Sequence, residues 1–191
     1  MRKALFGLPF AALVMAAAAS AQAPAPPAAP SIIPPAEIAA NPANRLTIEL
    51  SNGGKIVIQL RPDVAPANVE RIQTLVRRGF YNGLTFHRVI PGFMAQGGDP
   101  KGTGEGGSEL PDLKAEFSAI PHLRGTVSMA RAEAEDSANS QFYIMFAPMA
   151  SLNGRYTIIG RVIQGMDAVD SIAVGQPPET PTKIVSAKLG S

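Results

Sequence analysis

The stretch of the sequence that could do chemistry is 86–99, which reads FHRVIPGFMAQGGD. It places one cation, Arg88, and one carboxamide, Gln96, among several large apolar side chains. If the stretch begins as a strand, alternation puts Arg88 on one face with Phe86 and Ile90, and the Pro-Gly pair that follows predicts a turn. An arginine with apolar neighbours is unusual in a plain core. It suits a cleft that holds an apolar group beside a carbonyl.

Stretch 86–99 resembles the catalytic signature of the cyclophilins, the peptidyl-prolyl cis-trans isomerases. Further matches to this family follow in family order and spacing: GTVSMAR at 125–131, NSQFYI at 139–144 and LNGRYTIIGRV at 152–162. The resemblance covers roughly 45–189. It implies a peptidyl-prolyl isomerase that acts on proline-containing, unfolded or partly folded polypeptides.

The resemblance also assigns roles to single residues. Arg88 would be the catalytic residue, because its guanidinium can stabilise a twisted amide and stays charged at any ordinary pH. Taken alone, Arg88 could instead pair with a nearby acid. The residues implied to contact the substrate are His87, Phe93, Met94, Gln96, Ala130, Arg131, Ala132, Gln141, Phe142, Tyr143, Leu152 and Tyr156.

Within that set, Phe93, Met94, Phe142 and Leu152 match the family's hydrophobic proline pocket, although each one alone is more typical of a core. The two glutamines match groups that hold the substrate backbone, and the two alanines line the groove. Tyr143 replaces a pocket phenylalanine, so its hydroxyl could touch the pocket. The histidine lies beside the site, and a general base is not expected there because the reaction transfers no proton.

Three positions depart from the cyclosporin-sensitive members of the family. Ser151 stands where they carry tryptophan, Tyr156 where they carry histidine, and Arg131 where the eukaryotic proteins carry asparagine. Each departure resembles the bacterial exported branch. Because the indole contact is missing, the sequence predicts weak cyclosporin binding.

The implied reaction needs no cofactor and no metal. Rotation about a peptide bond meets a barrier of about 18–20 kcal/mol from amide resonance, but no bond has to break. The chain has no cysteine and only two histidines, which disfavours thiolate and histidine metal sites. An acidic segment with Glu109, Asp112 and Glu116 is more typical of a solvated surface. The glycines of 102–107 lack the Gly-Lys-Ser/Thr of a phosphate-binding loop.

The charge balance argues against nucleic acid as a partner. Seventeen basic and fifteen acidic side chains give a net charge of +2, and Arg2 and Lys3 account for the whole excess. The remainder is neutral and therefore has no electrostatic attraction for nucleic acid or an anionic membrane. No residue argues for a dimer, so we expect a monomer.

The N-terminus predicts export. Residues 1–23 combine a basic start, an apolar run and small-residue cleavage sites after position 21 or 23. The alternative, a membrane anchor, is disfavoured because the run is shorter than the ~20 residues of a spanning helix, so no stable membrane insertion is expected after cleavage.

Residues 24–44 are rich in proline and alanine and predict an extended, poorly ordered tether. The isomerase domain would be 45–191, and its location periplasmic.

The domain reads as mainly β. Alternating strands are expected near 46–50, 56–60 and 85–90, with further short strands up to 183–189. Helices are expected after Pro66, with Gly79 as the stop, and over 166–172. The family resemblance sharpens this pattern to a closed eight-stranded antiparallel β-barrel capped by two α-helices, with a packed interior and the site in a groove outside.

Three other functions remain as alternatives. A non-catalytic proline-binding module would use the same groove, but the retained Arg88 argues against it. A hydrolase would need an activated serine, yet no Gly-x-Ser-x-Gly elbow is present. A structural or nucleic-acid-binding barrel is disfavoured by the neutral charge.

Overall fold

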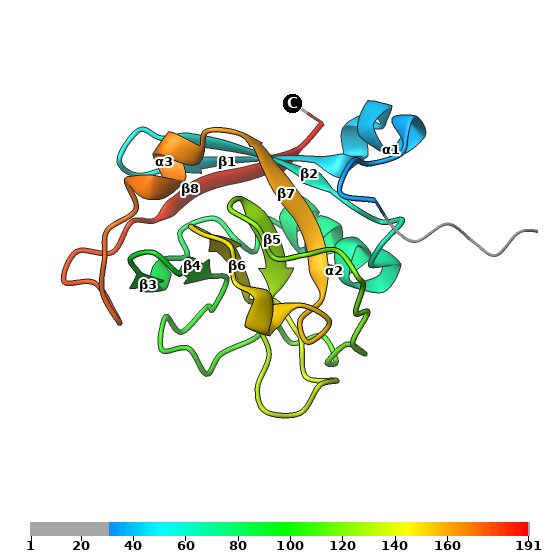
Figure 1. The fold of residues 1–191 in the computed structure, drawn as a ribbon. Coiled ribbons are helices and arrows are strands. Elements are labelled where there is room, and N and C mark those ends of the chain that lie inside the picture. The colour runs from blue at the N-terminus through cyan, green and yellow to red at the C-terminus, as the bar shows by residue number, and fades with distance from the viewer. Residues whose placement is uncertain (1–30, 191) are drawn as a thin grey trace, which may run out of the picture.

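The computed structural model describes residues 31–190. The expected signal peptide, residues 1–23, and the first part of the expected tether lie outside these residues. A single antiparallel sheet holds the described strands in the order β3-β4-β6-β5-β7-β2-β1-β8 (Figure 1). Their bounds are β1 Arg45–Leu50, β2 Lys55–Leu60, β3 Phe86–Ile90, β4 Met94–Gly97, β5 Thr126–Met129, β6 Phe142–Met145, β7 Ile158–Gln164 and β8 Ile184–Leu189.

The expectation of a closed barrel is wrong. The sheet curls in Figure 1 so that β8 and β1 lie above β3 and β4, but its two end strands share no ladder. Between them runs the isolated bridge of Thr85 with Lys183, and the Phe86 N–H donates to the Thr182 carbonyl at 3.0 Å. Further along β3, Val89 pairs with Gly175 of the loop before β8, so β8 itself does not continue the ladder. The result is a strongly curled half-barrel.

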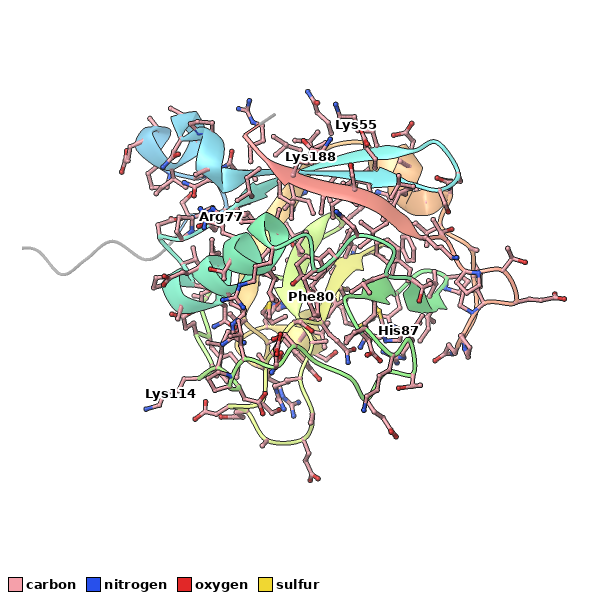
Figure 2. All side chains as sticks on the ribbon, turned by 180° about the vertical axis from the view of Figure 1, so that it is seen from behind. Lys55, Arg77, Phe80, His87, Lys114 and Lys188 are labelled. Carbon is pink, nitrogen blue, oxygen red and sulfur yellow. The ribbon has the colours of Figure 1, made fainter. Side chains whose placement is uncertain are left out.

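The two expected helices are present as α2, Pro66–Arg77, and α3, Met166–Asp170. The first begins with proline at its first turn and is followed by Gly79, whose φ of 69° suits a helix stop. Figure 2 shows α2 across the back of the sheet, with Phe80 just beyond its end. Within 31–190, no helix has both the length and the apolar character needed to cross a bilayer.

The interior of the curled sheet is packed. The inward faces of the strands and the apolar face of α2 form one core, and its largest fully buried members include Ile48, Leu60, Ile72, Phe86 and Ile144. The void left among β1, β2 and α2 measures about 10 Å³. Such a space holds no ligand, so any binding site must lie outside the sheet.

Residues 31–44 differ from the extended tether that the composition predicts. They contain α1, Ala36–Ala40, and the short 3-10 helix η1, Pro42–Asn44. Arg61 donates to the Ile32 carbonyl at 3.1 Å, and Gln59 donates to the carbonyls of Ile38 and Asn44. These side chains satisfy backbone acceptors that proline-rich sequence cannot pair by itself, which explains why the segment folds onto the domain.

Candidate active site

The β3–β4 hairpin places the expected catalytic arginine. Arg88 lies opposite Gln96 across the ladder, and the register shifts between Phe86 and Arg88. This bulge breaks the alternation, because two residues of β3 oppose one of β4. Phe86 therefore points into the core, while Arg88 faces outward, contrary to the shared face that simple alternation predicts. The bulge thus turns Arg88 toward solvent and the groove.

Arg88 is half-buried and held by neutral groups. Its Nε donates to Gln176 Oε1 at 3.2 Å and its Nη1 donates to Gln96 Oε1 at 3.2 Å. The guanidinium carbon lies 5.9 Å from the ring centroid of Phe93, within the range of a cation–π contact. Neither ion pair found within residues 31–190 involves Arg88, so its charge is not neutralised by a carboxylate.

A small apolar pocket opens beside this cation. Its volume is about 100 Å³, well below the ~300–1,000 Å³ of sites for drug-sized ligands. Met94 and Tyr143 are its buried lining residues, and they pack with Met145 in one buried cluster that partly buried apolar residues surround. The residues that line the pocket are Arg88, Phe93, Met94, Gln96, Ala130, Arg131, Tyr143, Leu152 and Tyr156. The pocket can take one small apolar side chain and hold it next to a guanidinium.

A second, larger hollow of about 530 Å³ adjoins the pocket and shares three of its residues, Gln96, Ala130 and Arg131. It is lined further by the loop 104–108 and by Ala132 and Gln141. Ala132 therefore belongs to this hollow and not to the apolar pocket. Because they share these residues, the two spaces form one groove that continues beyond the small pocket.

Two glutamines connect the pocket to the loop that walls the larger hollow. Gln96 Nε2 donates to Gln141 Oε1 at 2.8 Å, and Gln141 Nε2 donates to the carbonyls of Gly104 and Gly106 at 2.9 and 2.7 Å. The Asp99 carboxylate accepts backbone N–H groups of the same loop. Burial tends to raise the pKa of Asp99, but these hydrogen bonds outweigh it and lower the pKa. The groove wall is thus preformed.

Arg131 contributes to the rim through its backbone position and its stacked side chain. Its guanidinium lies 4.8 Å from the ring centroid of Tyr156 and donates to the carbonyls of Ala132, Glu133 and Arg155. These contacts use most of its donors. Arg131 therefore ties two loops together at the edge of the pocket, and its charge is not aimed at the pocket's floor.

Tyr143 carries a buried hydroxyl below the pocket. This hydroxyl lies 3.3 Å from His122 Nε2, which also contacts Ser128 Oγ at 3.0 Å, while His122 Nδ1 lies 3.3 Å from Asn153 Oδ1. Burial raises the pKa of Tyr143 and lowers the pKa of His122, so both groups are neutral near pH 7. The sequence had indicated that the Tyr143 hydroxyl could touch the pocket. Its contacts run instead to this buried network.

Two residues implied at the site lie elsewhere. Phe142 is buried in the core, with its ring 5.7 Å from Tyr81 and 6.2 Å from Phe86. Alternation along β6 sends Phe142 inward and Tyr143 outward. His87 lies at the bulge, is 4% exposed and has no hydrogen-bond partner at either ring nitrogen among the described residues. It is outside the residues that line the two hollows.

The sequence missed Gln176. It lies in the loop between α3 and β8, 88 positions from Arg88 in sequence, and nothing in its neighbourhood resembles a motif. His122 was also missed as a partner of Tyr143. Neither residue carries a local signal, because each reaches the site only through the folding of distant segments.

The hydrolase alternative fails on access. Ser128, His122 and Asn153 lie within hydrogen-bond distance in a line, but the serine and the histidine are 0% and 1% exposed. A buried serine cannot reach a substrate carbonyl. Ser140 is also buried and donates to the Gly98 carbonyl. These serines are structural.

The acidic segment around Glu116 supports the fold. Glu116 accepts the backbone N–H groups of Ala67 and Asn68 at 3.1 and 3.0 Å, at the start of α2. Asp63, which precedes this helix in sequence, pairs instead with Arg61. Over residues 31–190 the structure has no group of three His, Cys, Asp or Glu side chains able to hold a metal ion.

The comparison with known families decides the identity. The model of the cyclophilin-type peptidyl-prolyl cis-trans isomerase family matches residues 45–189. The chain belongs to the cyclophilin family. It is therefore a peptidyl-prolyl cis-trans isomerase, and the matched residues include the arginine, the small pocket and the groove described above. The segment 31–44, which folds onto the cyclophilin domain, lies outside the match.

Two bacterial peptidyl-prolyl cis-trans isomerases are similar to this chain over most of their length. A probable peptidyl-prolyl cis-trans isomerase of Brucella suis is 50% identical over 167 residues, which cover 79% of this chain and 85% of the relative. Peptidyl-prolyl cis-trans isomerase B of Bacillus subtilis is 44% identical over 128 residues, covering 66% and 88% of the two chains.

Solved structures agree on the fold. The crystal structure of a cyclophilin from Hirschia baltica has a TM-score of 0.72 and 30% identity, covering 78% of this chain and 74% of that one. A Cryptosporidium parvum cyclophilin crystallised in the presence of the dipeptide Ala-Pro has a TM-score of 0.72 and 28% identity, covering 77% and 99%. The curled eight-stranded sheet is thus a cyclophilin fold.

Proposed function

We propose that this cyclophilin catalyses Xaa-Pro rotation through Arg88, with the proline ring held in the pocket of Phe93, Met94, Tyr143 and Leu152. The observation that carries the proposal is that Arg88 lines the same small apolar pocket as these residues. A proline ring in the pocket brings its own amide nitrogen beside the guanidinium. The substrate chain on either side would extend along the larger hollow.

The chemistry follows from amide resonance. Twisting the C–N bond localises a lone pair on the proline nitrogen, which a cation can then stabilise. Acceleration from tens of seconds to milliseconds needs a gain of ~10⁴, or about 5.5 kcal/mol. Two or three charge-assisted hydrogen bonds at roughly 1.5–3 kcal/mol each, made better to the twisted state, supply this amount. Among residues 31–190, Arg88 Nη2 makes no hydrogen bond, so its N–H donors remain available to a substrate.

The test compares cis-trans exchange of a short Ala-Pro peptide with the wild-type protein and with Arg88→Ala. We expect the variant to lose at least tenfold in kcat/KM. Arg77→Ala is the matched control, since Arg77 is exposed at the end of α2 and lines neither the pocket nor the larger hollow. Equal catalysis by Arg88→Ala, with an unchanged unfolding midpoint, would move the chemistry to another group.

We also propose that the protein is exported, acts in the periplasm as a monomer, and assists the folding of exported chains. The support is the basic start and apolar run of residues 1–23. Expression of the full chain, cell fractionation and mass spectrometry of the product test this. We expect a periplasmic product that begins near residue 22 or 24. A cytoplasmic product of full mass contradicts it, and refolding of an exported protein limited by a prolyl bond tests the folding role.

A further inference from the structure

The loop between α3 and β8 brings a side chain to the candidate catalytic arginine. Gln176 Oε1 accepts a hydrogen bond from Arg88 Nε at 3.2 Å. The backbone of the loop is also held beside Arg88. The backbone of Gly175 pairs with that of Val89, the residue after Arg88, through hydrogen bonds of 2.8 and 3.1 Å. The position of Gln176 is therefore set by backbone pairing with β3.

We infer that Gln176 is a positioning residue for the guanidinium of Arg88. This inference rests on the catalytic role of Arg88 proposed above. A guanidinium on a long side chain can rotate about its last bonds, and a single acceptor leaves that rotation free. Gln96 holds Nη1 from β4, and Gln176 holds Nε from the opposite side of β3. Two acceptors on different elements fix the plane of the group.

Both acceptors are neutral amide oxygens, so they hold the guanidinium without neutralising its charge. A carboxylate would hold Arg88 at the expense of its charge, whereas an amide oxygen leaves the full charge available to the substrate. Gln96 is itself held by Gln141 at 2.8 Å. With Nε and one Nη1 hydrogen engaged, the donors of Nη2 remain for the twisted amide. Gln176 thereby acts on catalysis through Arg88, without touching the pocket, whose lining does not include it.

The consequence is a specific kinetic pattern. Removing Gln176 should leave the proline pocket intact, so the affinity for a proline peptide should stay within about twofold. The orientation of the guanidinium should relax, and misplacement of a catalytic group lowers turnover steeply. We expect Gln176→Ala to lower kcat about 3- to 10-fold at nearly unchanged KM.

The experiment is a double-mutant cycle on the full mature protein with an Ala-Pro peptide. The variants are Gln176→Ala, Arg88→Ala and the double variant, and kcat and KM are both measured by exchange spectroscopy. Gln164→Ala is the control, because Gln164 is an exposed glutamine at the end of β7. Urea unfolding of every variant shows that the fold is retained. If Gln176 acts through Arg88, its removal has no further effect in the Arg88→Ala background.

The outcomes separate the two proposals. If Arg88→Ala retains full activity, the catalytic role of Arg88 fails, and the positioning role of Gln176 fails with it. If Arg88→Ala loses activity but Gln176→Ala does not, only the positioning role is overturned. Equal losses from Gln176→Ala with and without Arg88, or a loss confined to KM, also overturn it, because Gln176 would then act on the substrate directly.

Discussion

Acidification should destabilise this fold through its two histidines, His87 and His122. Both are buried, at 4% and 1% exposure. Burial lowers the pKa of His87, despite the nearby Asp99 carboxylate, and the charge of Arg88 adds to the effect. Burial also lowers the pKa of His122, against a hydrogen bond with Asn153 that favours the charged ring. The folded protein therefore keeps both rings neutral at pH values where the unfolded chain protonates them.

The size of the effect follows from proton linkage. In the unfolded chain each histidine has a pKa of about 6.5, so above this pH both states hold neutral rings and the full stability is present. Below it the unfolded chain binds up to two more protons. Each contributes at most about 1.4 kcal/mol per pH unit, or about 2.7 kcal/mol for both. This loss continues until the pH falls through the lowered pKa values of the folded state.

The Asp99 carboxylate does not obscure this window. The pKa of Asp99 is lowered from its ordinary value of 3.8, so the stability that it contributes is lost only at pH values below the histidine range. Between about pH 4.5 and 6.5 the two histidines should therefore give a slope that is separate from the titration of Asp99. A domain with a free energy of unfolding of about 5–15 kcal/mol should lose a measurable part of it here.

The assay is urea unfolding at pH steps from 7.5 to 4.5, with the free energy of unfolding plotted against pH. His87→Leu should remove about half of the slope, because it removes one of the two titrating rings. Leucine is a suitable replacement, since the His87 ring makes no hydrogen bond that would be lost. His122→Gln should remove the other half. A flat wild-type profile over this range, or an undiminished slope in His87→Leu, would refute the linkage between burial and acid sensitivity.

Three further predictions concern single residues. Glu116→Ala should lower the free energy of unfolding by about 1–2 kcal/mol, because it uncaps the start of α2, whereas exposed Glu109→Ala should change it little; equal losses would contradict the capping role. Gly98→Ala should lower the free energy of unfolding by about 2–4 kcal/mol, since the φ of Gly98 is 88° and a Cβ there would lie 2.6 Å from a backbone carbonyl oxygen. Gly53→Ala has a similar φ but open space around the new Cβ, so it should lower the free energy of unfolding by only about 1–2 kcal/mol. Urea unfolding of the two variants compares these costs, and equal costs would contradict the role of the close contact. Cyclosporin should inhibit weakly because Ser151 supplies no indole contact; sub-micromolar inhibition of isomerisation would contradict this.

Local pattern was a good guide to the elements. Alternation predicted β1 and β2, and Pro66 and Gly79 predicted the two ends of α2. These patterns depend on residues close in sequence, so they predict the elements without knowledge of the tertiary contacts. Alternation failed at the Phe86–Arg88 bulge, because a bulge depends on the pairing with the neighbouring strand. The resemblance implied Phe142 at the site, but its side chain lies in the core, because the packing of the sheet decides which face of β6 points inward.

The sequence by itself determined the family, the outward-facing pocket residues on β4, and the chemistry available to an arginine beside apolar side chains. Only the tertiary structure decided that the sheet stays open between β3 and β8, that residues 31–44 fold onto the domain, and that His122 lies beneath Tyr143. It also decided that Gln176 reaches Arg88. The physical reason is the range of the interactions: strand periodicity and turn chemistry are encoded over a few residues, whereas hydrogen bonds between segments far apart in the chain exist only after the backbone has brought them together.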